Sequence, residues 1–493
     1  MKRVLLSLIV GVVSSFAFAH DIIGYWKGEV MSLPIVFHVV EREGGLSATL
    51  DSPMQGAKDI PCESIELKGD SVVIKMPLLQ ASFKGVFEAD ENSIRGIFTQ
   101  GISVPMLLTR TTEEACKLYR PQEPKPPFVY NSREVTFSHD GITLAGTLTT
   151  PMWGYRYPAV VLVTGSGAQN RDEEILGHNP FAVIADYLTR AGFAVLRYDD
   201  RGVGGSTKGN PDDTTLDYAT DAIAAIKFLK TQSIIDSTRI GVMGHSEGGT
   251  IAFICAAQRP DDVAFVVSLG GAVVKGKELM VMQNKMIAEA AGRPLTGELE
   301  QNVVAVFDAI DSIEDNDELS LQLKELMVMQ NKMIAEATGR QLTEELEQNV
   351  AAVFDAIDSI KDNDRLSLRL NELMAKQGNL SEAEIARQVK HMVSPWYSAF
   401  IRLNPGEYIQ KMKCPVLALN GEWDVQVNAQ QNLDALKTIY PEAEVKIYPR
   451  VNHMFQETSS LGQSLNYGAI SQTFSPKVLD DIVKWLVKIT AKK

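Results

Sequence analysis

The chain has 493 residues, a length that predicts more than one hydrophobic core. Apolar residues make up 45% and charged residues 22% of the composition, which is typical of a soluble globular protein and excludes a wholly disordered one. The formal net charge is −14 and Lys and Arg are not clustered, which argues against a nucleic-acid partner.

The first 19 residues have the pattern of a secretory signal peptide. Lys2 and Arg3 precede an apolar run that ends in AFA, a small-residue cleavage site, so the mature chain is expected to begin at His20. An uncleaved membrane anchor is the alternative, and it is disfavoured because the apolar run is shorter than the ~20 residues that span a bilayer. After cleavage, no stable membrane insertion is expected. We therefore expect an exported protein, either periplasmic or extracellular.

Residues 20–120 are expected to form a small antiparallel β domain. Short alternating stretches such as PIVFHVV and SVVIKM are separated by turn signals such as GG and KGD. Export into an oxidising compartment would permit a disulfide between Cys62 and Cys116, which the sequence does not decide. The proline-rich segment 121–128 is typical of an interdomain linker.

Residues 129–274 and 411–493 alternate strands with helices. Continuous apolar stretches such as AVVLVTG, FAVLRYD and RIGVMG are typical of parallel strands that helices cover on both faces. The same alternation resumes with PVLALNG and EVKIYP. The predicted fold is therefore α/β, a mostly parallel sheet with helices on both faces, preceded by the small β domain.

Residues 275–410 interrupt this alternation and contain an internal repeat. Residues 277–323 recur as residues 324–370 without a gap, and seven of the 47 aligned positions differ. Apolar residues at helical spacing predict two amphipathic helices in each copy, so the insertion is expected to be a helical lid with a tandem duplication. Its methionines either line an apolar pocket or pack one helix on the next, and packing is favoured.

The sequence GHSEG places Ser246 between two glycines at the junction of a strand and a helix. A nucleophile elbow needs such a turn, because it holds the serine hydroxyl clear of both elements, and side chains at Gly244 and Gly248 would collide with neighbouring backbone. A serine hydroxyl also needs a histidine to take its proton and a carboxylate to orient that histidine. Ser246 is therefore the candidate nucleophile.

Two histidines follow Ser246 in the chain. His391 falls in the helical insertion, whereas His453 directly follows the EVKIYP strand and is expected at the same edge of the sheet as the elbow. The acid should follow the preceding strand, where Asp424 is the first choice and Glu422 the second.

A tetrahedral oxyanion requires two hydrogen-bond donors. The backbone N–H of Glu247 at the start of a helix is one candidate, and within the loop TGSGAQNRDE the amide of Ser166 is the other. GSGAQN and DDRGVGGS lack the spacing of a dinucleotide site, and no CxxC or HExxH occurs, so neither a nucleotide cofactor nor a metal is expected. Asp199, Asp200 and Arg201 are interpreted as structural charge pairs, with a role in the site left open.

Residues 130–493 resemble the α/β-hydrolase superfamily. The motifs that carry the resemblance are GHSEGG, TGSGAQNRDE, RYDDRGVGGS, NGEWDVQV and VNHMF. More narrowly, the chain is similar to secreted carboxylesterases related to the serine aminopeptidase and dienelactone hydrolase groups, in which a small β domain precedes the hydrolase. The resemblance implies Ser246 as nucleophile, His453 as base and Asp424 as orienting acid. The chain departs from the pattern at Thr164, where many relatives carry histidine.

The sequence thus predicts a serine hydrolase that cleaves small or medium carboxylic esters through an acyl-enzyme, without a cofactor. A serine aminopeptidase or another peptidase is the alternative, because the same triad cleaves amides. A non-catalytic binding protein is less favoured, since the serine, the acid and the histidine are all in place. The sequence does not indicate an oligomeric state.

Overall fold

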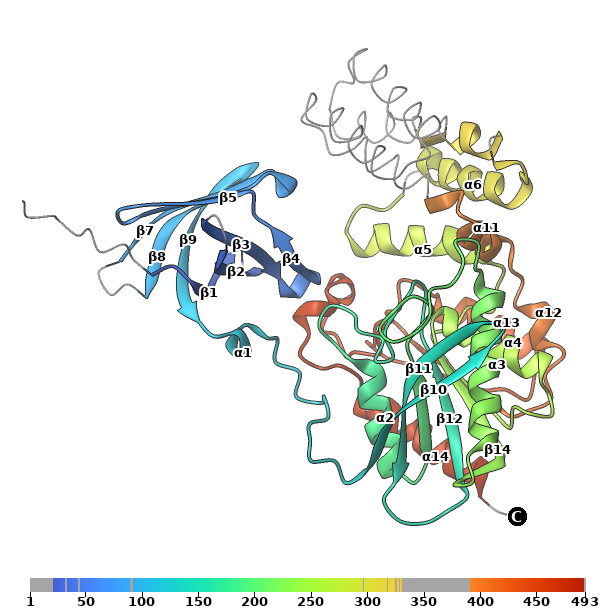
Figure 1. Cartoon of the computed structure of the whole chain (residues 1–493). Helices are drawn as coiled ribbons and strands as arrows, with labels where there is room; N and C mark the ends of the chain where they lie inside the picture. Colours follow the sequence, from blue (N-terminus) through green and yellow to red (C-terminus); the bar gives the residue numbers. More distant parts are fainter. Residues whose placement is uncertain are drawn as a thin grey trace, which may run out of the picture. The chain divides into compact units, whose positions relative to one another are not determined.

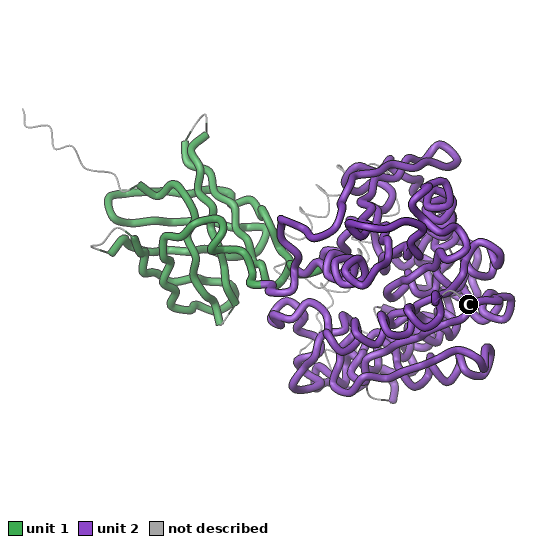
Figure 2. Tube along the Cα trace, turned by 90° about the horizontal axis from the view of Figure 1, so that it is seen from below, with its two compact units in different colours: residues 1–119, 175–177 green, residues 120–174, 178–493 purple. Residues whose placement is uncertain are grey.

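The structure is a computed structural model that describes residues 21–31, 33–42, 45–88, 92–295, 297–316, 318–323, 326, 327, 329 and 391–491. The chain divides into two compact units, residues 1–119 with 175–177 and residues 120–174 with 178–493 (Figure 2). The expected signal peptide and most of the second repeat copy lie outside the described residues.

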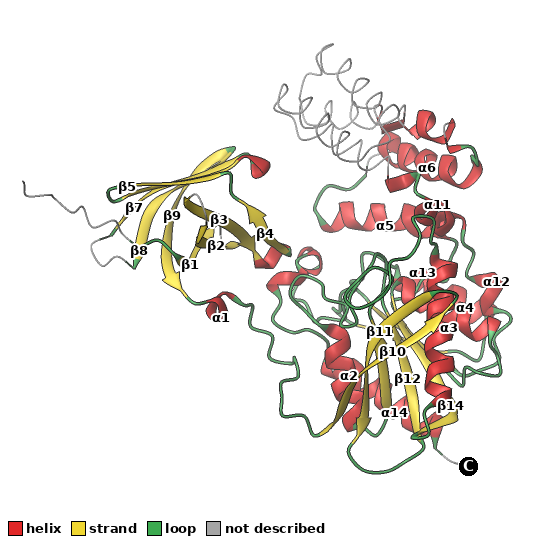
Figure 3. Ribbon diagram, viewed as in Figure 1, coloured by secondary structure: helices red, strands yellow, loops and turns green. Residues whose placement is uncertain are grey.

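In the described part of the first unit, nine strands form one antiparallel sheet in the order β4-β3-β2-β1-β9-β8-β7-β6-β5 (Figure 3). Side chains alternate along each strand: in β6, Val72, Ile74 and Met76 are buried and the residues between them are more exposed. The buried face forms a core with Trp26 and Phe37, as the alternating pattern predicts. The strands are β1 (Gly24–Val30), β2 (Leu33–Arg42), β3 (Gly45–Ser52), β4 (Ala57–Pro61), β5 (Ser64–Lys68), β6 (Ser71–Met76), β7 (Ala81–Phe87), β8 (Ser93–Gln100) and β9 (Ile102–Thr111), followed by the short helix α1 (Glu113–Cys116).

The two cysteines of the first unit, Cys62 and Cys116, are free thiols. Burial raises the pKa of Cys62 to about 11, and burial also raises the pKa of Cys116. Since the thiolate is the reactive form of cysteine, neither side chain is a strong nucleophile near neutral pH.

The described residues of the second unit include an eight-stranded sheet in the order β10-β11-β13-β12-β14-β15-β16-β17. Figure 1 labels β10, β11, β12 and β14 of this sheet, with helices packed around them. β10 pairs with β11, and β11 with β13, in antiparallel fashion, whereas every pair from β13 to β17 is parallel. This is the mostly parallel sheet that the sequence predicts. The strands are β10 (Tyr130–His139), β11 (Ile142–Pro151), β12 (Tyr157–Val163), β13 (Ala194–Tyr198), β14 (Ile235–His245), β15 (Val266–Leu269), β16 (Val416–Gly421) and β17 (Glu444–Tyr448).

Helices cover both faces of this sheet, so its strands are apolar throughout. In β12, Val161 and Val163 enter a core with α3, α4 and α13, whereas Val160 and Leu162 enter a second core with α2 and α14. Both faces are therefore buried, as expected for this fold class. The helices on these two faces are α2 (Pro180–Arg190), α3 (Thr215–Thr231), α4 (Glu247–Gln258), α12 (Gly406–Ile409), α13 (Ala429–Ile439) and α14 (Pro476–Thr490).

The described part of the insertion is helical. The first repeat copy includes the helices α5 (Gly276–Ala290) and α6 (Gly297–Ser312), and its residues 316 and 318–323 are helical too, beyond the two helices that the sequence predicts. Helix α11 (Pro395–Arg402) lies near the end of the insertion. Leu279, Phe307 and Phe400 pack these helices into a separate apolar cluster. Met280 borders this cluster and Met327 is buried in it, which favours the packing role for these two methionines. Among the described residues, no helix has the length and apolarity to cross a membrane.

Candidate active site

Ser246 occupies a sharp turn between β14 and α4, with φ 55° and ψ −121°. A positive φ is unfavourable for a residue with a side chain, so the packing of the flanking residues must hold Ser246 in this conformation. A Cβ atom on Gly244 would lie 1.9 Å from the carbonyl oxygen of Gly248, and one on Gly248 would lie 2.1 Å from that of Val163. The glycines on either side of Ser246 therefore allow strand, turn and helix to approach one another as the nucleophile-elbow pattern requires.

His453 and Asp424 lie in the loops that follow β17 and β16, and both are almost fully buried. The His453 Nδ1 atom is 2.8 Å from Asp424 Oδ2. The other oxygen, Oδ1, accepts hydrogen bonds from the backbone N–H groups of Gln426 (2.9 Å) and Val427 (2.8 Å). With its proton on Nδ1, donated to Asp424, the imidazole leaves Nε2 free to accept a proton.

The structure brings these predicted residues to one edge of the sheet. The backbone N–H of Ser246 donates to the carbonyl of Leu269 (2.9 Å), and the next residue, Gly270, packs against the acid and the histidine. A Cβ atom on Gly270 would lie 3.3 Å from both Asp424 Oδ2 and His453 Nδ1. Ser246, Asp424 and His453 therefore surround one short segment of backbone.

The second choices lie elsewhere. Glu422 is exposed, and its Oε2 atom accepts a hydrogen bond from the backbone N–H of Arg450 (3.0 Å). His391 precedes α11 and its ring lies beside those of Trp396 and Tyr397. The geometry therefore favours Asp424 and His453 over these two residues.

Residues 158–460, more than half of the chain, match the family model described as alpha/beta hydrolase fold. The chain belongs to this family. Esterase EstD of Thermotoga maritima is 38% identical to it over 112 residues, which cover 22% of this chain and 26% of EstD. Cutinase est2 of Thermobifida alba is 31% identical over 144 residues, which cover 27% of this chain and 42% of the cutinase.

The chain thus matches less than half the length of these curated relatives. Among solved structures, Est1E from Butyrivibrio proteoclasticus with bound ferulic acid aligns with 73% of this chain and 100% of its own, at 16% identity and a TM-score of 0.40.

In this alpha/beta hydrolase, the loop after β12 lies against the elbow. A Cβ atom on Gly165 would lie 3.1 Å from Cβ of Ser246. The backbone N–H of Gly165 is already engaged, because it donates to Glu173 Oε1 at 2.7 Å. Of the amides in this part of the loop, that of Ser166 is therefore the better candidate to face a substrate oxygen, together with the amide of Glu247 at the first position of α4.

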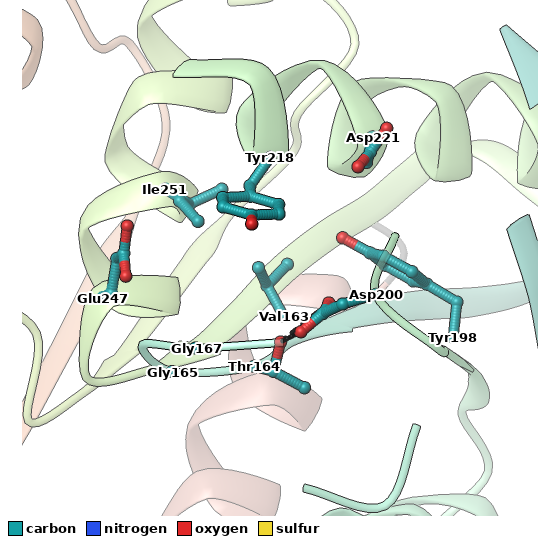
Figure 4. Close-up of a pocket in the computed structure, with 10 residues that line it drawn as sticks. All are labelled: Val163, Thr164, Gly165, Gly167, Tyr198, Asp200, Tyr218, Asp221, Glu247 and Ile251. Atoms are coloured by element: carbon teal, nitrogen blue, oxygen red, sulfur yellow. Dashed lines mark hydrogen bonds between the residues drawn. The ribbon is translucent and has the colours of Figure 1, made fainter. Parts of the chain in front are cut away.

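A small pocket lies beside this loop and is lined by β12, α3 and α4 residues (Figure 4). Inside it, the Thr164 hydroxyl donates to the buried carboxyl of Asp200 at 2.8 Å from Oδ2, and the backbone N–H of Gln169 donates to the same oxygen at 2.9 Å. Burial raises the pKa of Asp200 to about 8. Thr164, where the sequence departs from the pattern that it resembles, thus anchors the loop to Asp200.

The neighbours of Asp200 are charge pairs, as the sequence interpretation proposes. Asp199 binds Arg171, in the loop that follows Gly165, through the Nε (3.0 Å) and Nη2 (2.8 Å) atoms of the guanidinium. Arg201 binds Asp221 of α3 and also Asp213. Residues 199–201 therefore connect two parts of the fold. Asp199 and Asp200 bind the loop after β12, and Arg201 binds α3.

The Glu247 side chain, which the sequence analysis leaves unassigned, is also buried. Its Oε1 atom accepts hydrogen bonds from the Thr215 hydroxyl (2.6 Å) and from the indole N–H of Trp396 in α11 (3.1 Å), and the Ser166 side chain is a third partner. Burial raises the pKa of Glu247, although these three donors counteract part of the rise. The residue after the nucleophile therefore connects the elbow, the loop after β12 and the insertion.

Proposed function

We propose that this protein hydrolyses carboxylic esters through a covalent acyl-enzyme on Ser246. The observation that carries the proposal is the buried His453–Asp424 hydrogen bond of 2.8 Å beside a serine held in a strained elbow. The partial similarity to esterase EstD and to cutinase est2 supports esters as the substrate class.

In the proposed reaction, Ser246 Oγ attacks the acyl carbonyl carbon while His453 Nε2 takes the hydroxyl proton. The negative charge that develops on the carbonyl oxygen is stabilised by the backbone N–H groups of Glu247 and Ser166, each worth about 3 kcal/mol of barrier lowering. The alcohol then leaves with the proton from His453. A water molecule, deprotonated by the same histidine, attacks the acyl-enzyme and releases the acid.

A serine aminopeptidase would use the same groups, and it would also need free carboxylates that bind the amino terminus of the substrate. The three carboxyl groups around the pocket of Figure 4 already have partners. Asp200 bonds Thr164, Asp221 bonds Arg201, and Glu247 accepts the hydrogen bonds described above. These three carboxyl groups are therefore committed to other partners. The acidic residues of the insertion lie partly outside the described residues, so the aminopeptidase stays the alternative.

The test is initial-rate hydrolysis of p-nitrophenyl esters from acetate to laurate by wild type and Ser246→Ala. We expect the variant to lose roughly 10⁴-fold or more in kcat. Ser237→Ala is the matched control, since Ser237 is an exposed serine of the same strand β14 and should leave the rate unchanged. The chain length that gives the highest rate would report the size of the acyl group that the site accepts.

Aminoacyl p-nitroanilides assayed beside the esters separate the two hydrolase alternatives. Cleavage of anilides without cleavage of esters would refute the ester proposal and leave a peptidase. If neither substrate is cleaved and a fluorophosphonate probe does not label Ser246 in the folded protein, the non-catalytic alternative would replace both.

We also propose that the protein is exported, as the N-terminal sequence predicts. The test is N-terminal sequencing of the mature protein from the periplasm or the culture medium of an expressing bacterium. A mature chain that begins at His20 would support the proposal, and a chain that keeps residues 1–19 in the cytoplasm would refute it.

A further inference from the structure

A second histidine and a second carboxyl group are buried directly behind the proposed triad. His245, the last residue of β14, is 5% exposed, and Glu173, in the loop between β12 and α2, is 1% exposed. The rings of His245 and His453 have centroids 4.7 Å apart. The proposed triad needs neither His245 nor Glu173, so their burial at this place calls for another explanation.

Three hydrogen bonds connect this pair to the proposed catalytic groups. His245 Nε2 lies 3.0 Å from the backbone carbonyl oxygen of His453, and His245 Nδ1 lies 2.9 Å from Glu173 Oε1. The same oxygen of Glu173 accepts the backbone N–H of Gly165, at 2.7 Å. The pair therefore links the backbone of the candidate base to the loop that carries the candidate oxyanion donor, Ser166.

The chemistry of these partners fixes the number of protons on the pair. A carbonyl oxygen only accepts hydrogen bonds, so His245 Nε2 must carry a proton. If the imidazole were neutral, Nδ1 would present a lone pair to a carboxylate of Glu173 that also only accepts. Two acceptors at 2.9 Å repel each other, and a proton must therefore lie between Nδ1 and Oε1.

The surroundings place that proton on His245. Burial by itself disfavours a charged imidazole, but the negative charge of Glu173, its hydrogen bond, the His453 carbonyl and the charge of Asp424 outweigh burial and raise the pKa of His245. The charged and titratable groups that face His245 are therefore Glu173, Asp424 and the His453 ring. An imidazolium paired with a carboxylate satisfies all three hydrogen bonds at once.

We propose that His245 and Glu173 are a positioning pair, in which the proton between Nδ1 and Oε1 keeps His453 and the loop of Gly165 in register for catalysis. The inference rests on the proposed function, in which His453 and that loop act together. When the pair loses its proton, either Nδ1 faces Glu173 as an acceptor, or Nε2 faces the His453 carbonyl as one. In both cases a hydrogen bond that positions the site is lost, and kcat falls as the pH rises.

The first experiment compares wild type, Glu173→Gln and Glu174→Gln in kcat and KM for a p-nitrophenyl ester from pH 5 to pH 10. A glutamine atom at the Oε1 position cannot both accept from Gly165 and donate to Nδ1 of His245. We expect kcat to fall 10- to 100-fold and KM to change less than twofold. In Glu173→Gln, the fall of kcat at high pH that deprotonation of the pair causes in wild type should also be absent.

Glu174→Gln is the matched control, because Glu174 is the adjacent, exposed carboxylate, bonded to the Asn170 side chain. It should retain the wild-type kcat and pH profile. If Glu173→Gln stays within twofold of the wild-type kcat, or keeps the same alkaline loss of kcat, the positioning pair is refuted.

A second measurement needs no substrate and no folded variant. In wild-type protein labelled with ¹⁵N-histidine, we expect the His245 ring to keep both N–H protons to a higher pH than the ordinary histidine value of 6.5. A His245 ring that becomes neutral at or below pH 6.5 overturns the proposal. If no ester is hydrolysed, the proposed function fails on its own, whereas this titration still decides the state of the pair.

Discussion

Replacement of Asp424 by asparagine is predicted to disable the proposed triad without disturbing its packing. The two side chains have the same shape, but asparagine must place its NH₂ group where one carboxylate oxygen was. Asp424 Oδ1 accepts two backbone N–H groups, and Oδ2 accepts one N–H, that of His453. The NH₂ group of the asparagine must therefore face either the two backbone N–H groups or the N–H of His453.

The structure predicts the choice. An NH₂ group directed at the two backbone donors would leave both unsatisfied in a buried site, at about 1–3 kcal/mol each. Directed at His453, it opposes a single donor, and the imidazole can respond by moving its proton from Nδ1 to Nε2. The protein should adopt this second arrangement, in which Nε2 can no longer accept the proton of Ser246. A wrong tautomer of this kind lowers kcat about 10⁴-fold, or about 5 kcal/mol of transition-state stabilisation.

The assay is the initial rate of p-nitrophenyl acetate hydrolysis at pH 7.5 for wild type, Asp424→Asn and Glu422→Gln, with thermal unfolding as a check on folding. Glu422→Gln should match wild type, because Glu422 is exposed and bonds Arg450. A folded Asp424→Asn enzyme within tenfold of the wild-type kcat would refute the assignment of Asp424 as orienting acid. A large loss in Glu422→Gln alone would transfer the role to that residue.

Three further substitutions follow from the packing around the site. Gly248→Ala should prevent soluble folding, because its Cβ would lie 2.1 Å from a backbone carbonyl oxygen of β12; soluble expression measures this. In wild type, burial raises the pKa of Asp200 to about 8, so the native protein keeps a proton there that the unfolded chain releases at about pH 4. The free energy of unfolding of wild type therefore falls as the pH rises from about 4 to about 8. Asp200→Asn should show a smaller fall over this range in urea denaturation. Trp396→Phe removes a donor to the buried Glu247 and should lower the free energy of unfolding by about 1–3 kcal/mol in urea denaturation.

Each of these substitutions has a control at an exposed or open position. Gly297→Ala has open space at its Cβ and should express normally, Asp212→Asn should keep the wild-type pH dependence, and Trp153→Phe, 87% exposed in wild type, should leave stability unchanged. Soluble Gly248→Ala protein, an unaltered pH slope in Asp200→Asn, or equal stability of Trp396→Phe and wild type would each contradict the corresponding contact.

Much of the fold could be predicted from local pattern. The glycines around Ser246 and the apolar stretch that becomes β14 are neighbours in sequence, so the elbow is readable without knowledge of the rest of the chain. The positions of Asp424 and His453 follow from chain order, because the carboxyl ends of parallel strands meet at one edge. These expectations needed only the periodicity of apolar residues, the positions of turn residues and the direction of the strands.

The polar contacts behind the site could not be predicted in this way. Glu173 and His245 are 72 residues apart, and Glu247 and Trp396 are 149 apart. No periodicity indicates which buried carboxyl group meets which donor across such a separation, since that depends on how strands and helices stack. The acid at position 173 and the histidine of GHSEG were visible signals, yet each taken alone suggests no partner.

The backbone conformation of Ser246 also has an evolutionary consequence. A side chain at φ 55° and ψ −121° carries on the order of 1–3 kcal/mol of strain, which glycine would relieve. Glycine would also give the unfolded chain more conformational entropy, which lowers stability by about 1 kcal/mol. An inactive Ser246→Gly protein is therefore expected to be at least as stable as the active one. Selection for stability or expression alone would not retain the hydroxyl group, so its presence is the outcome expected when selection acts on chemistry.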